Sequence, residues 1–277
     1  MTGHAVCVLG MHRSGTSLAM RALNLLGVAL GDSSTLLPAD PVDNPAGYWE
    51  QQAIIDINNE LLLAMGGPSW APPELRPGWS RAAELEPQRE RARRLLDDQF
   101  GRLPLWGFKD PRTSLTLEFW RELVPDMSFV VCLRRAEEVV ASLLARDPDG
   151  PLSAEYWARL WVRYTVDALE QTRDTPRTIV VYEDWFIDAA RQVEVLAKHL
   201  GLERAPQEAL AAVTAYVDPS LWRQREPDPA IAAQVPPAAC ELYDSIRASI
   251  SSSTRAADRS GLSRSVSSTR SGCSGGS

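Results

Sequence analysis

Apolar residues follow two alternating patterns between residues 5 and 200, namely short continuous runs and longer helical spacings. The runs have the length of strands and cover residues 5–9, 105–109, 127–133 and 178–182. The third run is apolar almost throughout, which is typical of a strand covered on both faces. Between the runs, apolar residues recur every three or four positions, as on one face of a helix. The expected helices follow residue 17 and then cover 54–65, 88–100, 114–123, a segment after 135, 153–172 and 188–200. Strands and helices in this order predict an α/β fold with a parallel sheet between layers of helices.

The first strand leads directly into a loop bounded by two glycines. The segment from Gly10 to Ser17 reads GMHRSGTS, and a helical spacing follows it. Backbone N–H groups in such a loop point at one position, where the positive end of the helix dipole also lies. Glycine permits the tight backbone path at Gly10 and Gly15. The stretch therefore predicts an anion site.

This loop nearly matches the nucleotide-binding pattern G-x-x-x-x-G-K-[ST], and the mismatch is informative. Thr16 stands where the pattern has lysine, and a basic residue occurs instead inside the loop, at Arg13. Without the lysine that reaches the terminal phosphates, ATP chemistry is disfavoured. A guanidinium can still hold an anion through two parallel hydrogen bonds. The alternative interpretation is a plain strand, turn and helix with an ordinary exposed arginine.

Polar residues follow each of the four expected strands. They are the Gly10–Ser17 loop, Lys109 to Arg112, Arg134 with Arg135, and Glu183 with Asp184. Ligands on open parallel sheets bind beyond the carboxyl ends of the strands. We therefore expect one site to be assembled from all four segments.

Composition narrows the class of protein without identifying it. The chain has 277 residues, of which 44% are hydrophobic and 23% charged, as in an ordinary globular protein. Its net charge of −7 predicts no general basic surface for nucleic acid. No apolar run approaches the roughly 18–20 residues that cross a membrane, and the start MTGHAVCVLG lacks the features of a signal peptide.

The four cysteines are widely scattered, at Cys7, Cys132, Cys240 and Cys273. Their spacing fits neither a zinc site nor a disulfide framework, so we expect free thiols and a cytoplasmic protein. Residues 250–277 are rich in Ser, Arg and Gly with few apolar side chains. Such a segment cannot bury enough surface to offset its ordering entropy. We expect one domain over residues 1–249 and a disordered tail over 250–277.

Four segments together resemble the sulfotransferases that use 3′-phosphoadenosine-5′-phosphosulfate (PAPS). The loop is similar to that of a bacterial group reading GMHRSGTS, and residues 133–142 (LRRAEEVVAS) resemble the second family motif apart from Ala136, where proline is common. The Lys109-Asp110-Pro111 and Tyr182-Glu183-Asp184 segments resemble two further family segments, the latter structural. The resemblance spans Ala5 to Leu202 and implies a P-loop-containing three-layer fold.

The resemblance also implies which residues hold the donor. The loop residues at the 5′-phosphosulfate would be His12, Arg13, Ser14, Gly15, Thr16 and Ser17. Arg13 would contact the bridging oxygen, Lys109 the transferring group, and Arg134 with Ser142 the 3′-phosphate. A sulfuryl group carries less charge than a γ-phosphoryl group, so we expect these cations and backbone amides to suffice without a metal. Arg223 would lie in a late loop that closes over the 3′-phosphate.

An acceptor hydroxyl also needs a base, and Glu50 is the candidate because it lies at the end of the long loop that begins at residue 31 and could reach the site. The alternative is a carboxylate placed at a helix start, where the dipole favours it. His12 is the rival base. Trp70 and Trp79 lie on a second long loop and either line the acceptor cleft or pack that loop against the body. The resemblance implies sulfuryl transfer to a hydroxyl or amine of a small-molecule, carbohydrate or lipid acceptor.

Two other functions share this pattern. A P-loop kinase of a small metabolite would use ATP and Mg²⁺ on the same fold, but the loop lysine is missing and no obvious metal carboxylate follows the third strand. A non-catalytic nucleotide-binding module, with the tail as its contact element, is the third hypothesis.

Overall fold

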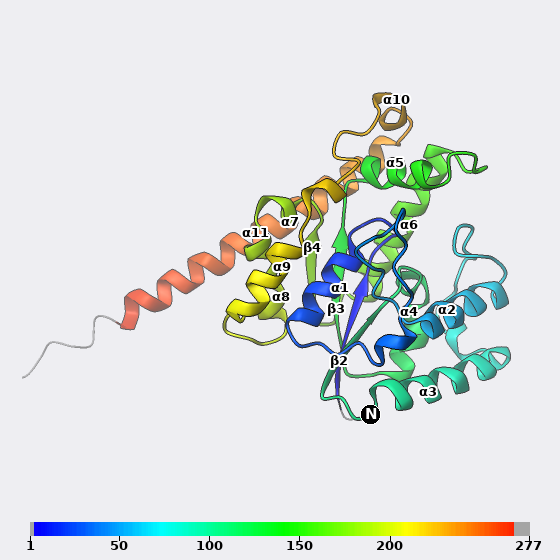
Figure 1. Ribbon diagram of the computed structural model, residues 1–277, viewed down its shortest axis with the longest axis horizontal. Helices are drawn as coiled ribbons and strands as arrows, with labels where there is room; N and C mark the ends of the chain where they lie inside the picture. Colours follow the sequence, from blue (N-terminus) through cyan, green and yellow to red (C-terminus); the bar gives the residue numbers. More distant parts are fainter. Residues whose placement is uncertain (1–2, 269–277) are drawn as a thin grey trace, which may run out of the picture.

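The computed structural model describes the backbone of residues 3–268 and the side chains of residues 3–252 (Figure 1). A parallel sheet of order β2-β1-β3-β4 lies at its centre. The strands are β1 (His4–Leu9), β2 (Leu105–Lys109), β3 (Met127–Leu133) and β4 (Arg177–Val181). The apolar runs thus form strands as expected, and the bounds of β2 and β3 agree with the expectation at both ends.

Helices cover both faces of this sheet. They are α1 (Thr16–Leu25), α2 (Gln52–Ala64), α3 (Glu86–Phe100), α4 (Thr113–Leu123), α5 (Ala136–Arg146), α6 (Ala154–Gln171), α7 (Asp184–Ile187), α8 (Ala189–His199), α9 (Gln207–Tyr216), α10 (Pro229–Ala232) and α11 (Pro237–Ser268). Short 3₁₀ turns occur at Ser33–Thr35, Trp79–Arg81, Ala83–Leu85 and Pro219–Leu221. None of the described helices is long and apolar enough to cross a bilayer.

The alternation of side chains along β1 explains its apolar sequence. Ala5, Cys7 and Leu9 point into a core formed with α2, α3 and α4. Val6 and Val8 point into a second core, formed with α1, α8 and α9. Successive strand residues face opposite sides of a sheet, so a central strand with helices on both sides must be apolar at every position. The expected α/β fold with two helical layers is confirmed.

The strand order determines where a ligand can enter. From β1 the chain moves to β2 on one side, then crosses β1 and continues to β3 and β4 on the other side. A crevice opens beyond the carboxyl ends of adjacent strands where the connections diverge in this way, here between β1 and β3. The Gly10–Ser17 loop follows β1, and Arg134 follows β3.

The chain after residue 202 differs from the expectation. The boundary expected at residue 250 falls inside α11, whose helical backbone continues to Ser268. Residues 250–268 contain no proline and a single glycine, Gly261, so nothing in the sequence stops a helix that began at Pro237. The domain boundary at residue 250 and the disorder of the tail stay predictions, and residues 269–277 lie outside the described residues.

The free thiols agree with the expectation where the structure describes them. Cys7 and Cys132 are buried in the sheet, and Cys240 is partly buried on α11. Burial raises the pKa of Cys132 to about 12, so this thiol stays protonated. Cys273 lies outside the described residues.

Candidate active site

The Gly10–Ser17 loop packs tightly against the ends of β3 and β4. Gly10 has φ +138°, and a Cβ there would lie 2.7 Å from the Cys132 carbonyl oxygen. Gly15 has φ +85°, and its Cβ would lie 2.5 Å from the Tyr182 ring. Glycine is therefore required at both positions for two reasons, because the backbone has a positive φ and because no side chain would fit. The helix α1 begins directly after the second glycine, so its free N–H groups face the loop.

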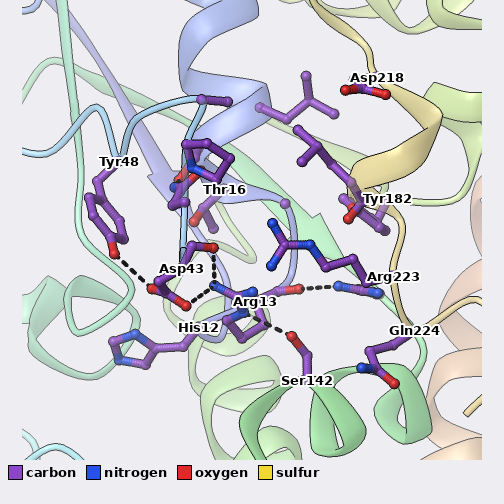
Figure 2. Close-up of a pocket in the computed structure, with 18 of the residues that line it drawn as sticks. His12, Arg13, Thr16, Asp43, Tyr48, Ser142, Tyr182, Asp218, Arg223 and Gln224 are labelled. Atoms are coloured by element: carbon purple, nitrogen blue, oxygen red, sulfur yellow. Dashed lines mark hydrogen bonds and ion pairs between the residues drawn. The ribbon is translucent and has the colours of Figure 1, made fainter. Parts of the chain in front are cut away.

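A cavity of about 330 Å³ opens over this loop (Figure 2). The loop over residues 31–48 and residues 216–224 form its other walls. The expected site residues that line it are His12, Arg13, Gly15, Thr16, Ser17, Glu50, Lys109, Arg134 and Ser142. Ser14 does not line it, because its side chain turns inward and its Oγ is buried without a hydrogen-bond partner among the described residues. The cavity thus brings together expected residues from the Gly10–Ser17 loop, the end of β2 and the segment after β3.

Arg13 crosses the floor of the cavity from the loop. Its Nε donates to Ser142 Oγ at 2.9 Å, and its Nη1 donates to Asp43 Oδ1 at 2.9 Å (Figure 2). Its φ of +69° is unusual for a residue with a side chain. Burial lowers the Arg13 pKa from its ordinary value while Asp43 opposes that change. A guanidinium nevertheless stays charged in proteins, so the floor of the cavity is cationic.

Asp43 was not anticipated from the sequence. It is carried on the long loop, pairs with Arg13, and accepts a hydrogen bond from the Tyr48 hydroxyl at 2.7 Å. Burial and this carboxylate raise the pKa of Tyr48 to about 12. The only sequence signal was the length of the loop, since long loops in compact domains are often functional. In the structure, the Asp43 carboxylate lies beside Arg13 in the wall of the cavity.

Arg134 is fixed from three sides at the end of β3. Its Nη1 donates to the Arg13 carbonyl at 2.9 Å and its Nε donates to Glu138 Oε2 at 2.9 Å. Its guanidinium lies 4.2 Å from the Tyr182 ring centroid. The remaining terminal nitrogen, Nη2, makes no hydrogen bond to any described residue. Arg134, which lines the cavity, is therefore held in place with one terminal nitrogen left without a partner among the described residues.

Lys109 and Glu50 form a buried ion pair that also lines the cavity. The exposed fractions of their side chains are 2% and 8%. Burial raises the pKa of Glu50 above its ordinary value, although Lys109 counteracts this. Trp49, which precedes Glu50, has φ +58°, and its indole donates to the Tyr216 hydroxyl at 3.0 Å. That contact holds the bend from which Glu50 enters the site.

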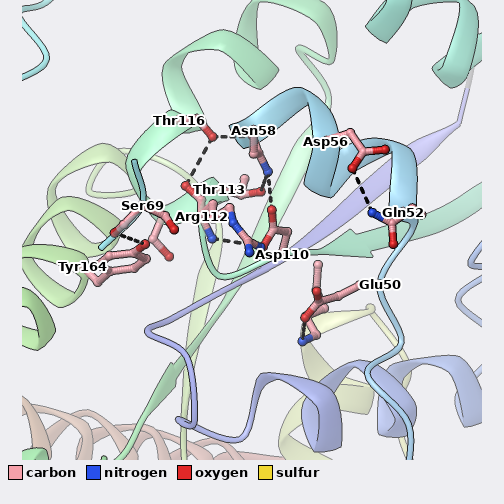
Figure 3. A network of polar contacts seen from close by, with 12 residues as sticks. Glu50, Gln52, Asp56, Asn58, Ser69, Asp110, Arg112, Thr113, Thr116 and Tyr164 are labelled. Atoms are coloured by element: carbon pink, nitrogen blue, oxygen red, sulfur yellow. Dashed lines mark hydrogen bonds and ion pairs between the residues drawn. The ribbon is translucent and has the colours of Figure 1, made fainter. Parts of the chain in front are cut away.

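Asp110 has a structural role in the turn that follows β2. It accepts from Arg112 Nη1 at 2.7 Å and from Asn58 Nδ2 at 2.8 Å (Figure 3). Asn58 in turn accepts hydrogen bonds from Thr116 and Trp120 on α4. This network fixes the turn after β2 and therefore the position of Lys109 one residue earlier.

The end of β4 contributes to the site differently from the expectation. Tyr182 lines the cavity, whereas Glu183 and Asp184 do not. Glu183 accepts a hydrogen bond from the Arg135 backbone at 3.0 Å, and Asp184 pairs with Arg247 of α11. The chain turns into α7 immediately after β4, and this turn directs both carboxylates away from the sheet edge. Their expected place in the site is therefore wrong, and the structural reading of this segment is right.

The remaining residues expected near the site are His12, Arg223 and the tryptophans Trp70 and Trp79. Burial and four cationic neighbours lower the His12 pKa well below its ordinary value, so the imidazole is neutral at pH 7. Arg223 lines the cavity and donates to the Val42 carbonyl at 3.0 Å. Trp70 lines a neighbouring cavity, whereas Trp79 packs against the hydrophobic core. The two tryptophans therefore have different roles.

Solved structures of other proteins align with the chain at low sequence identity. No protein-family model and no curated protein matches the chain. Among solved structures, sulfotransferase STF9 from Mycobacterium avium aligns with a TM-score of 0.49 and 16% identity, over 82% of this chain and 70% of that one. The sulfotransferase domain of the Synechococcus PCC 7002 olefin synthase aligns with 0.48 and 18%, over 89% and 95%. Retinol dehydratase, solved with androsterone and the inactive cofactor PAP, aligns with 0.44 and 14%, over 77% and 64%. Because one fold serves many activities, the chemistry is decided by the residues of the cavity.

Proposed function

We propose that this chain transfers a sulfuryl group from PAPS to an acceptor hydroxyl. The observation that carries the proposal is the convergence of Arg13, Lys109 and Arg134 on one cavity, although they lie at the ends of three different strands. Three cations beside the amide groups of a glycine-bounded loop suit a ligand with several anionic groups. PAPS carries its 3′-phosphate and its 5′-phosphosulfate on a single ribose, so a compact cluster can contact both.

The proposed reaction is an in-line displacement at sulfur. The bond between sulfur and the bridging phosphate oxygen breaks, and a bond from sulfur to the acceptor oxygen forms. The leaving group is adenosine 3′,5′-bisphosphate (PAP), whose new charge Arg13 stabilises, while Lys109 faces the sulfuryl oxygens. Fixed donors aimed at developing charge contribute most in a site from which water is excluded.

Arg134 and Ser142 are the proposed contacts of the 3′-phosphate. Arg134 lines the cavity, and its guanidinium is held by Glu138 and by the Arg13 carbonyl. Ser142 Oγ lies 2.9 Å from Arg13 Nε, so the groups proposed for the two ends of the donor touch each other. This contact places the two proposed anion sites next to each other.

Glu50 is the proposed base for the acceptor proton. It lines the cavity, and a carboxylate whose pKa is raised by burial accepts a proton more readily near neutral pH. The rival is His12, which is neutral and therefore able to accept a proton. The two assignments differ in which substitution removes the fall in turnover rate at low pH. Under the first it is a substitution of Glu50, and under the second a substitution of His12.

The kinase alternative is weaker on the same geometry. Thr16 lines the cavity at the position where a kinase of this fold carries lysine. The Asp43 carboxylate lines the cavity, but it is paired with Arg13 and not free to bind a metal ion. Among the residues that the structure describes, no three His, Cys, Asp or Glu side chains are grouped so as to hold a metal ion.

Calorimetric titration with PAP tests the proposal. We expect PAP to bind and Arg134→Gln to weaken it about ten- to a hundredfold, because a charged hydrogen bond contributes roughly 1.5–3 kcal/mol. Arg135→Gln is the matched control, since Arg135 lies over the Tyr243 ring and does not line the cavity. Absence of PAP binding, or consumption of ATP that depends on magnesium, would contradict the proposal.

A further inference from the structure

A second cavity, of about 440 Å³, lies beside the first and shares His12 and Arg146 with it. Helices α2, α5 and α6 and the loop after α2 enclose it. Most of its wall is apolar and consists of Leu63, Trp70, Leu143, Trp157 and Leu160. The shared histidine follows Met11 in the P-loop, so one end of this cavity opens at the position proposed for the sulfuryl group.

Two apolar side chains in this wall are left exposed to solvent. Leu63 is 60% exposed and Trp70 is 56% exposed. The loop that carries Trp70 is nevertheless fixed, since the Tyr156 hydroxyl donates to the Trp70 carbonyl at 2.8 Å. The Tyr164 hydroxyl donates to the Ser69 carbonyl at 3.1 Å, as Figure 3 shows. Because Leu63 and Trp70 line the same cavity, their exposed surfaces are available to an apolar ligand that enters it.

The charges around this cavity limit what it can bind. No carboxylate lines it, and its cations are Arg112, which is paired with Asp110, and Arg146. An ammonium group entering here would meet like charge without a partner. A sugar could reach the polar side chains of the wall, which are His12, Asn59, Ser69, Arg112 and Arg146, with only some of its hydroxyls. Hydroxyls that lie against leucine and tryptophan would lose water without gaining hydrogen bonds.

We infer that the second cavity is the acceptor site and that it selects an alcohol or phenol with an apolar body, in preference to a sugar or an amine. The hydroxyl lies at the His12 end, next to the donor cavity, and the apolar body lies between Trp70 and Leu63. This inference rests on the proposed function, because it places the acceptor next to the sulfuryl donor.

Binding and transfer by the full chain, saturated with PAP or supplied with labelled PAPS, test the inference. The probes are 2-naphthol, N-acetylglucosamine and 2-(aminomethyl)naphthalene, which separate the hydroxyl, the apolar body and the positive charge. We expect 2-naphthol to bind by calorimetry and to accept labelled sulfate, with the sugar and the amine at least about tenfold weaker. This difference corresponds to the selectivity of an apolar pocket.

Variants of the exposed wall locate the site. Trp70→Ala and Leu63→Ala should each raise the Kd and KM for 2-naphthol about tenfold, because they remove apolar contact area. Both side chains are more than half exposed, so the fold should tolerate their loss. The control is Ile187→Ala, an apolar residue of α7 that is 76% exposed and lines neither cavity. PAP affinity should be unchanged in all three variants.

The outcomes separate this inference from the proposed function. If PAP binds but 2-naphthol does not, or if the sugar or the amine is the better acceptor, the inference is overturned while the donor site stands. If Trp70→Ala and Ile187→Ala bind 2-naphthol equally well, the site lies elsewhere and the inference is again overturned. If PAP fails to bind, the proposed function itself fails.

Discussion

Arg13 and Trp49 are the two non-glycine residues with positive φ in the described part of the chain. Arg13 is itself a candidate catalytic residue, and Trp49 directly precedes another, Glu50. A positive φ costs an ordinary residue roughly 1–2 kcal/mol, so it persists only where other contacts compensate for it. Ser142 and Asp43 hold Arg13, and Tyr216 holds Trp49. Arg13 lines the cavity over the Gly10–Ser17 loop, and so does Glu50, the residue after Trp49.

We expect Arg13→Gly to separate the role of the side chain from that of the backbone. Glycine adopts the same φ without strain, so the free energy of unfolding should change little. Turnover should fall about 10²–10³-fold, as is typical when a donor to the transition state is removed. Denaturant unfolding and the rate of sulfuryl transfer measure the two effects. A large loss of stability with normal turnover would assign Arg13 a structural role only.

Asp43→Asn should act in the opposite direction on donor binding. The Asp43 carboxylate pairs with Arg13 at 2.9 Å, inside a cavity proposed to hold phosphate groups. An anionic ligand must either displace this carboxylate or lie next to a like charge. Asparagine removes the charge with little change of shape, so we expect the Kd of PAP to fall several-fold. Calorimetry checks this, and weaker binding would show that Asp43 organises Arg13 for the ligand.

The pH dependence of turnover should identify the base. Burial raises the pKa of Glu50, and only its carboxylate form can accept a proton, so activity should fall as pH decreases through that raised pKa. Glu50→Gln should abolish this limb and lower kcat about 10²–10⁴-fold. His12→Gln should leave the limb in place. If His12→Gln abolishes it instead, His12 is the base.

Stability has to be followed in the same variants. Glu50→Gln leaves Lys109 buried without a carboxylate, and breaking a buried ion pair from one side costs roughly 3–5 kcal/mol. The double variant with Lys109→Met removes both charges and should recover part of that loss. Rates are therefore compared at a temperature at which circular dichroism shows each variant to be folded.

Strands and their ends could be read from the sequence because the signal is local. In β2 and β3 an apolar run ends directly at charged residues, and both strands have the expected bounds. Glu183 and Asp184 were misplaced because a strand end does not reveal the direction in which the chain turns next. The short helix α7 has four residues, too few for a periodic pattern. Asp43 was missed because its partner lies on a different element and its own loop has no periodicity.

Gly10 lies between β1 and α1 and Gly27 lies after α1, and together they allow a test of close packing. Gly10 and Gly27 both have positive φ, but a Cβ at Gly10 would lie 2.7 Å from the Cys132 carbonyl oxygen, whereas a Cβ at Gly27 would have no heavy atom within 4 Å. Gly27→Ala should therefore cost only the backbone strain, about 1 kcal/mol. Gly10→Ala adds a clash with the backbone of β3 and should cost clearly more.

Urea unfolding of these two variants measures the difference. Gly10→Ala should also weaken PAP binding, because the loop must move away from β3 to admit the new methyl group. Equal losses of stability in the two variants would show that the loop can shift without cost. In that case the close contact with β3 would not be what shapes the anion site.

The fold as a whole is completed by a segment that the sequence pattern did not reveal. A third core lies between α5, α6 and α11, and α11 leaves the body of the molecule as a long helix (Figure 1). Ala239, Tyr243 and Ile246 of α11 are buried in this core. They recur at intervals of four and three residues, a helical spacing followed directly by the polar stretch that dominates the end of the chain. The change in composition concealed the apolar face before it.

Tyr243→Ala and Asp184→Asn should reveal which contacts attach α11 to the body. Tyr243 is 6% exposed, and replacing a buried aromatic residue by alanine typically costs about 3–5 kcal/mol. The ion pair of Asp184 with Arg247 is bidentate, at 2.5 Å for both hydrogen bonds, but a quarter to a third of its side-chain surface is exposed. A partly exposed pair contributes about 1 kcal/mol or less. We therefore expect Tyr243→Ala to lower the free energy of unfolding several times more than Asp184→Asn does.

PAP binding gives the control for this comparison, since neither residue lines either of the two cavities. Both variants should bind PAP with normal affinity at temperatures at which they remain folded. If Asp184→Asn proves as destabilising as Tyr243→Ala, the ion pair rather than apolar packing holds the helix. If Tyr243→Ala weakens PAP binding without unfolding the protein, α11 positions α5, and with it Ser142, for the donor.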